Sequence, residues 1–281
     1  MVSTQQITKA MKMVAAAKLR KSQDRIIQMR PFAEELGSIF RNLSSAQSDG
    51  QTDNWFSEPR EEGKILIVAI SSDRGLCGSF NTNVFKGVLK LIKEKYEKQF
   101  ASGNVTIFPI GKRADDYFSK RKYKVERQFA GIIAHISFEN VAAAAQHIMD
   151  AYRAGQYDKV EIVYNEFKNI ATQILQLEQY LPVLLPTNEE STPATDYIYQ
   201  PNHEEILSGL IPKSLKVQLF KAVLESNASE NGARMTAMDK ATENAGELLK
   251  ELRLSYNRTR QAAITKEILE IVGGAEALKA S

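Results

Sequence analysis

The loop after the first predicted strand contains the residues of this sequence that are best suited to chemistry. It reads SSDRGLCGSFN over residues 71–81 and stands between a β-branched run and an amphipathic helix. Many α/β domains bind phosphate groups at this place, on the amides of a helix N-terminus. However, Gly75 and Gly78 complete neither the GxxxxGK(S/T) nor the GxGxxG pattern. The spacing therefore favours a structural turn, or a contact with a protein partner, over nucleotide binding.

The other residue types with catalytic or metal-binding chemistry are isolated from one another. Cys77 is the single cysteine, which excludes an internal disulfide and suits a reducing compartment. No sequence signal gives it the histidine partner that a nucleophilic thiol needs. His135, His147 and His203 are scattered and form no HExxH pattern. We therefore predict no catalytic residue, no cofactor and no metal site.

Basic residues are concentrated on the first predicted helix, although the whole chain is nearly balanced with 37 Lys and Arg against 34 Asp and Glu. Nucleic-acid binding would add aromatic residues for stacking, and none occurs before Phe32, so we expect no nucleic-acid partner. Two interpretations remain, a solvated helix face or docking against acidic loops of a protein. Only Asp24 opposes the basic residues before Glu34, and these residues are Lys9, Lys12, Lys18, Arg20, Lys21, Arg25 and Arg30.

Long helices are expected at both ends of the chain. Residues 4–43 are rich in Ala, Lys, Met, Gln and Leu and predict one helix, bent near Pro31. A second helical region starts after Asn202, should break or restart at Pro212, and then runs without proline over residues 213–279. At about 1.5 Å per residue these helices span roughly 60 and 100 Å, so neither can fold back on itself. We predict that they form an antiparallel coiled coil.

The apolar positions of both helices follow the alternating three and four spacing of a coiled-coil seam. On the first helix the seam continues from Met11, Ala15 and Leu19 through Ile26, Met29, Ala33, Leu36, Phe40 and Leu43. On the second helix it is weak, with small and polar members at Met238, Thr242, Ala245, Leu249, Leu252, Tyr256, Thr259 and Ala263. A more apolar stripe lies beyond the reach of the first helix and predicts insertion into another protein, at Ile264, Ile268, Ile271, Ala275 and Leu278.

The middle of the chain predicts a Rossmann-like α/β domain of about five strands. Strands are expected at residues 64–70, 105–110, 159–166 and 172–178, with helices at 84–96 and 141–152. The last two strands could form a hairpin at one sheet edge. We therefore divide the chain into a coiled-coil helix (1–46), a linker (47–63), the α/β domain (64–200) and a second coiled-coil helix (201–281). The longest apolar run, residues 65–70, is far too short to cross a bilayer, so we expect no direct membrane insertion.

Three segments give the chain a specific resemblance to a known family. These are STQQITKAMKMVAAAKLRKSQ at residues 3–23, NASENGARMTAMDKATENA at 227–245 and SYNRTRQAAITKEILEIVGGAEAL at 255–278. Together with the SSDRGLCGSFN loop, they closely resemble the γ subunit of F-type ATP synthases, and the match follows the whole chain in order. Members of that family usually begin with roughly a dozen further residues, about three helical turns. The absence of a plastid-type cysteine insert favours a bacterial source.

This resemblance implies a function and a set of partners. It implies a non-catalytic rotor stalk that couples proton flow through the membrane sector to ATP synthesis or hydrolysis, by rotation inside a ring of α and β subunits. The ε subunit and the membrane c-ring would hold the other end, at the cytoplasmic face of the bacterial inner membrane. Contacts with the stator are implied, by motif, for Met11, Arg234, Arg260, Gln261, Thr265 and Glu267.

Two other functions are compatible with the residues alone. One is a nucleotide-dependent enzyme housed in the α/β domain, which would bind ATP or NAD as an isolated chain. The other is a static coiled-coil scaffold, which would tolerate cross-linking to its partners. The weak seam and the apolar end of the second helix favour a shaft whose bearing is another protein.

Overall fold

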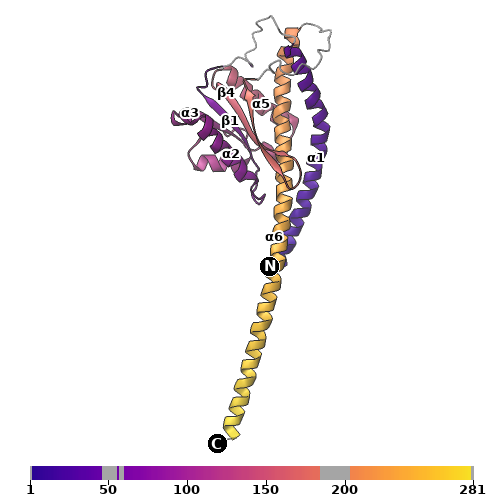
Figure 1. The fold of residues 1–281 in the computed structure, drawn as a ribbon, viewed down its shortest axis with the longest axis vertical. Coiled ribbons are helices and arrows are strands. Elements are labelled where there is room, and N and C mark those ends of the chain that lie inside the picture. Colours follow the sequence, from indigo (N-terminus) through magenta and orange to yellow (C-terminus); the bar gives the residue numbers. More distant parts are fainter. Residues whose placement is uncertain (1, 46–55, 57–59, 184–202, 280–281) are drawn as a thin grey trace.

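Two long helices of opposite direction dominate the structure, and an α/β domain lies against one of them (Figure 1). The computed structural model describes residues 2–45, 56, 60–183 and 203–279 of the 281-residue chain. Helix α1 (Val2–Ser45) runs beside the upper part of helix α6 (His203–Lys279), and the lower part of α6 extends past it (Figure 1). The expected antiparallel pair of terminal helices is confirmed.

The α/β domain is built on a single mixed sheet of five strands in the order β3-β2-β1-β4-β5. The first four are parallel and β5 is antiparallel to β4, which confirms both the Rossmann-like sheet and the predicted edge hairpin. The shortest strand, β3, has no counterpart among the predicted segments. The strands are β1 (Ile65–Ile70), β2 (Val105–Ile110), β3 (Lys124–Val125), β4 (Lys159–Phe167) and β5 (Gln173–Leu181).

Helices cover both faces of this sheet. Every residue of β1 is buried, and the side chains alternate between two cores, Leu66 and Val68 in one and Ile65 and Ile67 in the other. The first core is closed by α5 (Phe138–Arg153), the short helix η1 (Ile132–His135) and α6. The second is closed by helices on the opposite face, α2 (Phe80–Lys95) and α4 (Lys112–Lys120), while the short α3 (Glu97–Ala101) follows α2.

Helix α6 belongs to the core of the α/β domain as well as to the helix pair. Ile211, Leu215 and Leu219 are buried in the same cluster as β1 and α5. The buried Tyr180 hydroxyl of β5 donates to the Leu215 carbonyl oxygen at 2.9 Å. On α6, Leu224 and Ala228 pack instead with α1. One helix therefore ties the domain to the shaft.

The predicted interruption at Pro212 is wrong, because α6 continues through this residue. Proline in a helix interior removes one backbone hydrogen bond and usually kinks or ends the helix. Here Ile211 and Leu215, on either side of it, are both nearly fully buried against the sheet. This packing holds the helical path across the proline. Helix α1 is likewise continuous through Pro31.

The seam between α1 and α6 follows the predicted spacing only where the two helices overlap. Ala15, Leu19 and Ile26 of α1 are buried, as are Met238 and Ala245 of α6. Near Gly246 the overlap ends, since a Cβ atom there would stand 3.0 Å from Gln5 Nε2. Four predicted seam positions beyond this point are exposed in the structure: Leu252, Tyr256, Thr259 and Ala263. The side chains of Ala33, Phe40, Leu43 and Leu278 lie outside the described residues.

Part of the predicted linker is anchored in the domain. Phe56 is buried in the core that contains α5 and α6, and its carbonyl oxygen accepts a hydrogen bond from the Val183 amide at 2.7 Å. The rest of the predicted linker up to residue 59 lies outside the described residues.

Gly111 is a position where the fold requires glycine. It follows β2 with φ of 109°, a conformation that L side chains rarely adopt, and a Cβ atom there would stand 2.2 Å from the Ser71 carbonyl oxygen. We expect Gly111→Ala to lower the free energy of unfolding by about 3 kcal/mol or more in urea denaturation, since strain and a backbone clash add.

Gly131 provides the matched control for this substitution. It has φ of −88°, and a Cβ atom there would meet nothing within 4 Å. Gly131→Ala should change the free energy of unfolding by no more than about 0.5 kcal/mol. Equal effects of the two substitutions would contradict this account of the turn.

Candidate functional site

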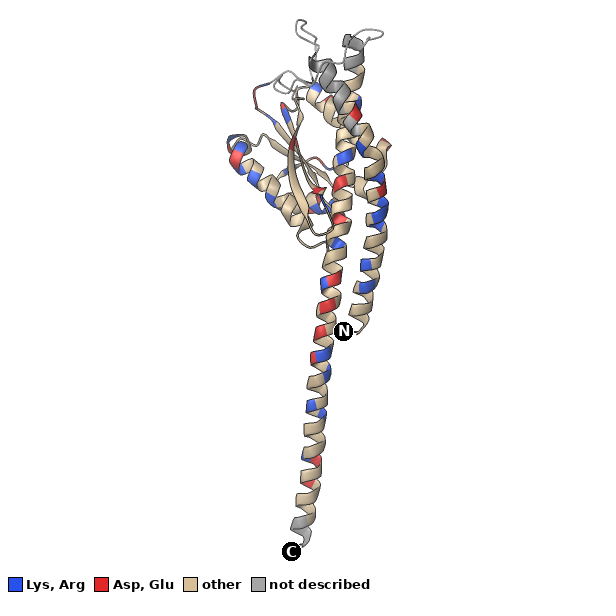
Figure 2. Ribbon diagram, turned by 45° about the vertical axis from the view of Figure 1, so that its right-hand side comes forward, with Lys and Arg blue, Asp and Glu red and all other residues tan. Residues whose placement is uncertain are grey.

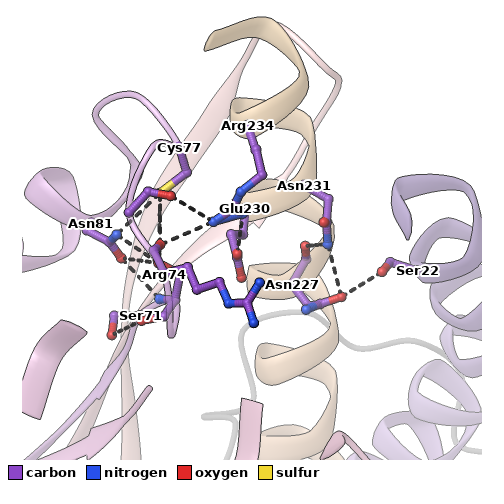
Figure 3. Close-up of polar contacts among 11 residues, drawn as sticks. Ser22, Ser71, Arg74, Cys77, Asn81, Asn227, Glu230, Asn231 and Arg234 are labelled. Atoms are coloured by element: carbon purple, nitrogen blue, oxygen red, sulfur yellow. Dashed lines mark hydrogen bonds and ion pairs between the residues drawn. The ribbon is translucent and has the colours of Figure 1, made fainter. Parts of the chain in front are cut away.

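The SSDRGLCGSFN loop is closed by its own side chains (Figure 3). The Asn81 side-chain oxygen accepts from the Ser72 amide at 3.0 Å, and its Nδ2 donates to Ser72 Oγ at 2.8 Å and Cys77 Sγ at 3.3 Å. Leu76 and Gly78 have positive φ and shape the turn, and the Leu76 side chain points outward, 67% exposed. The interior of the loop is filled by Ser72, Cys77 and Asn81 instead of offering amides to a phosphate group.

Arg234 of α6 fastens this loop to the long helix. Its Nη2 donates to the carbonyl oxygens of Arg74 at 3.1 Å and Gly75 at 3.0 Å, and Nη1 pairs with Glu230 at 2.5 Å (Figure 3). The loop thus turns carbonyl oxygens toward a cation, which is the opposite polarity from an anion site. Burial raises the pKa of the Glu230 carboxyl, and the Arg234 charge acts against this shift. These contacts, which we call the fastening, join the loop after β1 to α6.

A second polar joint connects three elements through Glu225 of α6, which is 1% exposed. Its Oε1 faces Arg30 Nη2 of α1 at 3.3 Å, and its Oε2 accepts from the Phe167 amide at the end of β4 at 3.2 Å. A carboxylate is stable at such a buried place only when its oxygens are paired. Glu225 therefore connects α1, α6 and the sheet at one point.

Polar contacts also connect α1 and α6 directly, and they run in opposite order along the two helices. Thr242 Oγ1 donates to Thr8 Oγ1 at 2.8 Å, and Lys12 pairs with Asp239 at 2.5 Å. Further along, Ser22 Oγ lies 2.6 Å from Asn227 Oδ1, its hydrogen-bond acceptor. These contacts define a single antiparallel register for the helix pair.

Beyond its overlap with α1, helix α6 is exposed on all sides. All of its described side chains from residue 250 to residue 275 are exposed, and they include large apolar groups. Ile271, for example, is 71% exposed. Acidic and basic residues are scattered along this part of α6, among residues of other types (Figure 2). We name residues 250–275 the free end. Its exposed apolar residues are Leu252, Leu254, Tyr256, Ile264, Ile268, Leu269, Ile271 and Val272.

The structure divides the six residues singled out by motif into two groups. Met11 is half-buried on the overlap of the two helices, and Arg234 is fastened to the loop and Glu230. Arg260, Gln261, Thr265 and Glu267 are exposed on the free end. Arg260 lies about 40 Å from Arg234 along the helix, at 1.5 Å per residue. The six residues therefore do not form one site.

Sequence reasoning missed the residues of the joints. Glu225, Glu230, Ser22 and Asn227 were not singled out, although the run ESNASEN at residues 225–231 carried a usable signal. Consecutive polar residues cover every face of a helix, so a helix already expected to pack on two sides had to bury some of them. Five of the six polar residues in this run are buried, and Ser229 Oγ is without a partner among the described residues.

The geometry defines a class of protein, a stalk in which one helix is shared between a two-helix shaft and an α/β domain. A family model described as ATP synthase matches residues 1–278. The chain is 54% identical to the ATP synthase gamma chain of Cytophaga hutchinsonii over 98% of this chain and 94% of that one. It is 53% identical to the gamma chain of Flavobacterium johnsoniae and 48% identical to that of Chlorobaculum parvum, over 98% and 99% of this chain and 94% of each relative.

Chains of solved ATP synthase structures are also similar to this chain. The central stalk and c-ring structure of the Tetrahymena thermophila mitochondrial ATP synthase contains a chain with a TM-score of 0.60 and 26% identity, over 84% of this chain and 99% of that one. A Euglena gracilis mitochondrial ATP synthase chain shares the fold with a TM-score of 0.57 at 19% identity, over 97% and 96% of the two chains. The chain belongs to the ATP synthase gamma chain family and is a non-catalytic, central-stalk subunit of that complex.

The fastening by Arg234 predicts a large effect on stability. Arg234→Ala leaves the mostly buried Glu230 without its cation, and we expect the free energy of unfolding to fall by about 3 kcal/mol in urea denaturation. The double variant Arg234→Ala/Glu230→Gln should recover part of this loss because no unpaired charge remains. Lys12→Ala, at a half-exposed ion pair, should cost less than about 1 kcal/mol. A cost for Arg234→Ala as small as that of the control would contradict the fastening.

The environment of Cys77 predicts an inert thiol. The side chain is 1% exposed, and burial raises the pKa of the thiol. Because the thiolate is the reacting form, less of it is present at any given pH than for a free cysteine. We expect alkylation by iodoacetamide at pH 8 to be at least about a hundredfold slower than for Thr259→Cys in a Cys77→Ser background, and urea to abolish the difference. Comparable rates in the folded protein would refute this.

Proposed function

We propose that this chain is the rotating shaft of an F-type ATP synthase, coupling proton flow through the membrane sector to ATP synthesis or hydrolysis in a ring of α and β subunits. The observation that carries the proposal is the free end of α6, a single helix about 40 Å long whose large apolar side chains have no cover among the described residues. Large apolar side chains gathered on an exposed surface mark a place where another protein binds. Catalytic subunits that enclose the free end would supply that cover.

The chemistry of the free end suits contacts that form and break during rotation. Arg260, Ile264 and Glu267 share one helix face, and Gln261, Thr265 and Ile268 share the face beside it. Each face thus mixes charged or polar groups with apolar side chains. Arg260 and Gln261 can hydrogen-bond acceptors of one subunit and then the equivalent acceptors of the next. A surface of this kind can bind each subunit in turn without forming a permanent complex with one of them.

The outer face of α1 fits the same function. Six of the seven basic residues between Lys9 and Arg30 are exposed, and they form a band of positive charge beside the overlap (Figure 2). Lys12 and Arg30 are paired with α6, while the others face outward. We assign this band and Met11 to contacts with acidic loops of the stator, because steering by opposite charge suits short-lived contacts.

The remaining partners belong to the opposite end of the molecule. The ε subunit and the membrane c-ring would attach to the α/β domain and the adjoining ends of α1 and α6, at the cytoplasmic face of a bacterial inner membrane. No helix of the described residues is long and apolar enough to cross a bilayer. The division of labour proposed is therefore residues 1–46 and 201–281 as shaft, residues 47–63 as linker and residues 64–200 as the attached domain.

Cross-linking at the free end tests rotation against a static scaffold. In a Cys77→Ser background, Gln261→Cys would be joined by a disulfide to a cysteine on a neighbouring β subunit in the assembled complex. We expect oxidation to abolish multiple-turnover ATPase activity and reduction to restore it, because a shaft tied to one catalytic subunit cannot turn. The matched control carries Lys98→Cys on the exposed surface of α3, where oxidation should leave turnover unchanged. Unimpaired turnover with the Gln261→Cys cross-link complete would favour the scaffold.

A further inference from the structure

A layer of polar side chains interrupts the apolar seam between α1 and α6. Ser22, 6% exposed, stands between the buried Leu19 and Ile26, and its hydroxyl lies 2.6 Å from Asn227 Oδ1 (Figure 3). Asn231, also buried, donates from Nδ2 to the Asn227 carbonyl oxygen at 2.8 Å and to Asn227 Oδ1 at 3.4 Å. The Asn227 side-chain oxygen is therefore held facing α1. We name Ser22, Asn227 and Asn231 the polar layer.

The apolar residues of the seam do not determine the axial register of α1 on α6. They repeat with the coiled-coil period, and several are small, such as Ala15, Ala228 and Ala245. Moving α1 by seven residues keeps an apolar stripe facing α6, so burial of apolar area alone distinguishes such registers poorly. The side chains of the Lys12–Asp239 pair are 39% and 46% exposed, so the pair contributes little to the choice of register. Something more specific must fix the position of α1.

We infer that Ser22 and Asn227 are positioning residues that fix the axial register of α1 on α6. A shift of α1 by one heptad, in either direction, would bring Phe220 or Arg234 opposite Ser22 and remove the 2.6 Å hydrogen bond that Asn227 Oδ1 accepts from Ser22. Asn227 Oδ1 would then keep only the long 3.4 Å contact from Asn231, and a polar group left under-satisfied at a buried interface costs free energy. Single buried polar residues fix register in coiled coils in this way. The polar layer therefore adds specificity to a seam that supplies little of it.

The register matters because α1 packs chiefly on α6. The axial position of α1 sets where Met11 and the basic band stand relative to the α/β domain. Arg30 does not fix that position as closely, because its side chain is long, half-exposed and joined to Glu225 at 3.3 Å. This inference concerns the fold of the chain and holds whether or not the proposed rotation is correct.

Disulfide trapping in the full-length chain reads the register directly. In a Cys77→Ser background, Thr8→Cys with Thr242→Cys reports the native register, since the two hydroxyls are 2.8 Å apart. Thr8→Cys with Leu249→Cys reports a shift of one heptad. With the polar layer intact, we expect the native pair to cross-link and the shifted pair to remain free. In Ser22→Ala/Asn227→Leu, the ratio of shifted to native product should rise by about tenfold or more.

Control variants separate register from general stability. Lys12→Ala/Asp239→Ala removes an exposed contact between the same two helices and should leave the ratio unchanged. Ser22→Thr keeps the hydroxyl and should retain the native product alone. If Ser22→Ala/Asn227→Leu does not fold, as judged by circular dichroism, Ser22→Ala alone provides the measurement, with a smaller rise in the ratio. An unchanged yield of the native product in the folded polar-layer variants would overturn the inference, because movement in either direction must lower that yield.

Discussion

The whole structure depends on one helix that is buried on two sides at once. Between residues 211 and 233, α6 closes the core of the α/β domain with Ile211, Leu215 and Leu219, and it packs on α1 with Leu224 and Ala228. An amphipathic helix has one apolar stripe, but this segment must offer two surfaces. The α/β domain, the helix pair and the free end therefore share a single continuous backbone. Force applied at one of them reaches the others without crossing a flexible connection.

The double burial explains why the middle of α6 carries so many paired polar groups. A helix that is apolar on every side would associate with many surfaces. Glu225 and Asn227 instead have specific partners on α1, and Arg234 has one in the loop after β1. These polar contacts make the arrangement of the packed elements specific, which apolar contacts alone do not. The joints at Glu225 and Arg234 fix the α/β domain about the shaft, and the polar layer fixes α1 along it. The free end has no such fixed partners among the described residues, which suits a surface that changes partners.

Much of this fold could be predicted from the sequence because its strongest signals are local. The β-branched run at residues 105–110 gave β2 with its observed bounds, and the three-four spacing located the seam residues Leu19 and Ile26. Pro212 was misjudged because the packing of the neighbouring residues outweighs the local preference of proline. The strand β3 and the helix α3, with two and five residues, are too short to show a period. The spacing also located Met11, which is half-buried at the helix overlap, but its contact with the stator was implied by the family motif alone.

The sequence could not have shown which residues contact each other at Glu225 and Arg234. Arg30 and Glu225 are separated by 195 positions, and Arg234 and Gly75 by 159, so no spacing rule connects them. The free end was easier to predict, because an apolar stripe extending past the reach of α1 is visible in the sequence. The four residues predicted as seam from Leu252 to Ala263 nevertheless belong to this exposed region. Spacing identifies a face that can pack, but it does not show which segment packs against it.

Direct observation of a probe on the α/β domain tests the central claim that the domain and the shaft turn as one unit. The complex would be immobilised through its catalytic ring, with a bead attached at Lys98→Cys on α3 in a Cys77→Ser background, and followed during ATP hydrolysis. The structure predicts stepwise rotation in one direction, at a rate that follows ATP turnover, since α6 connects the probe rigidly to the free end. A bead that stays still while the same molecules hydrolyse ATP would contradict it.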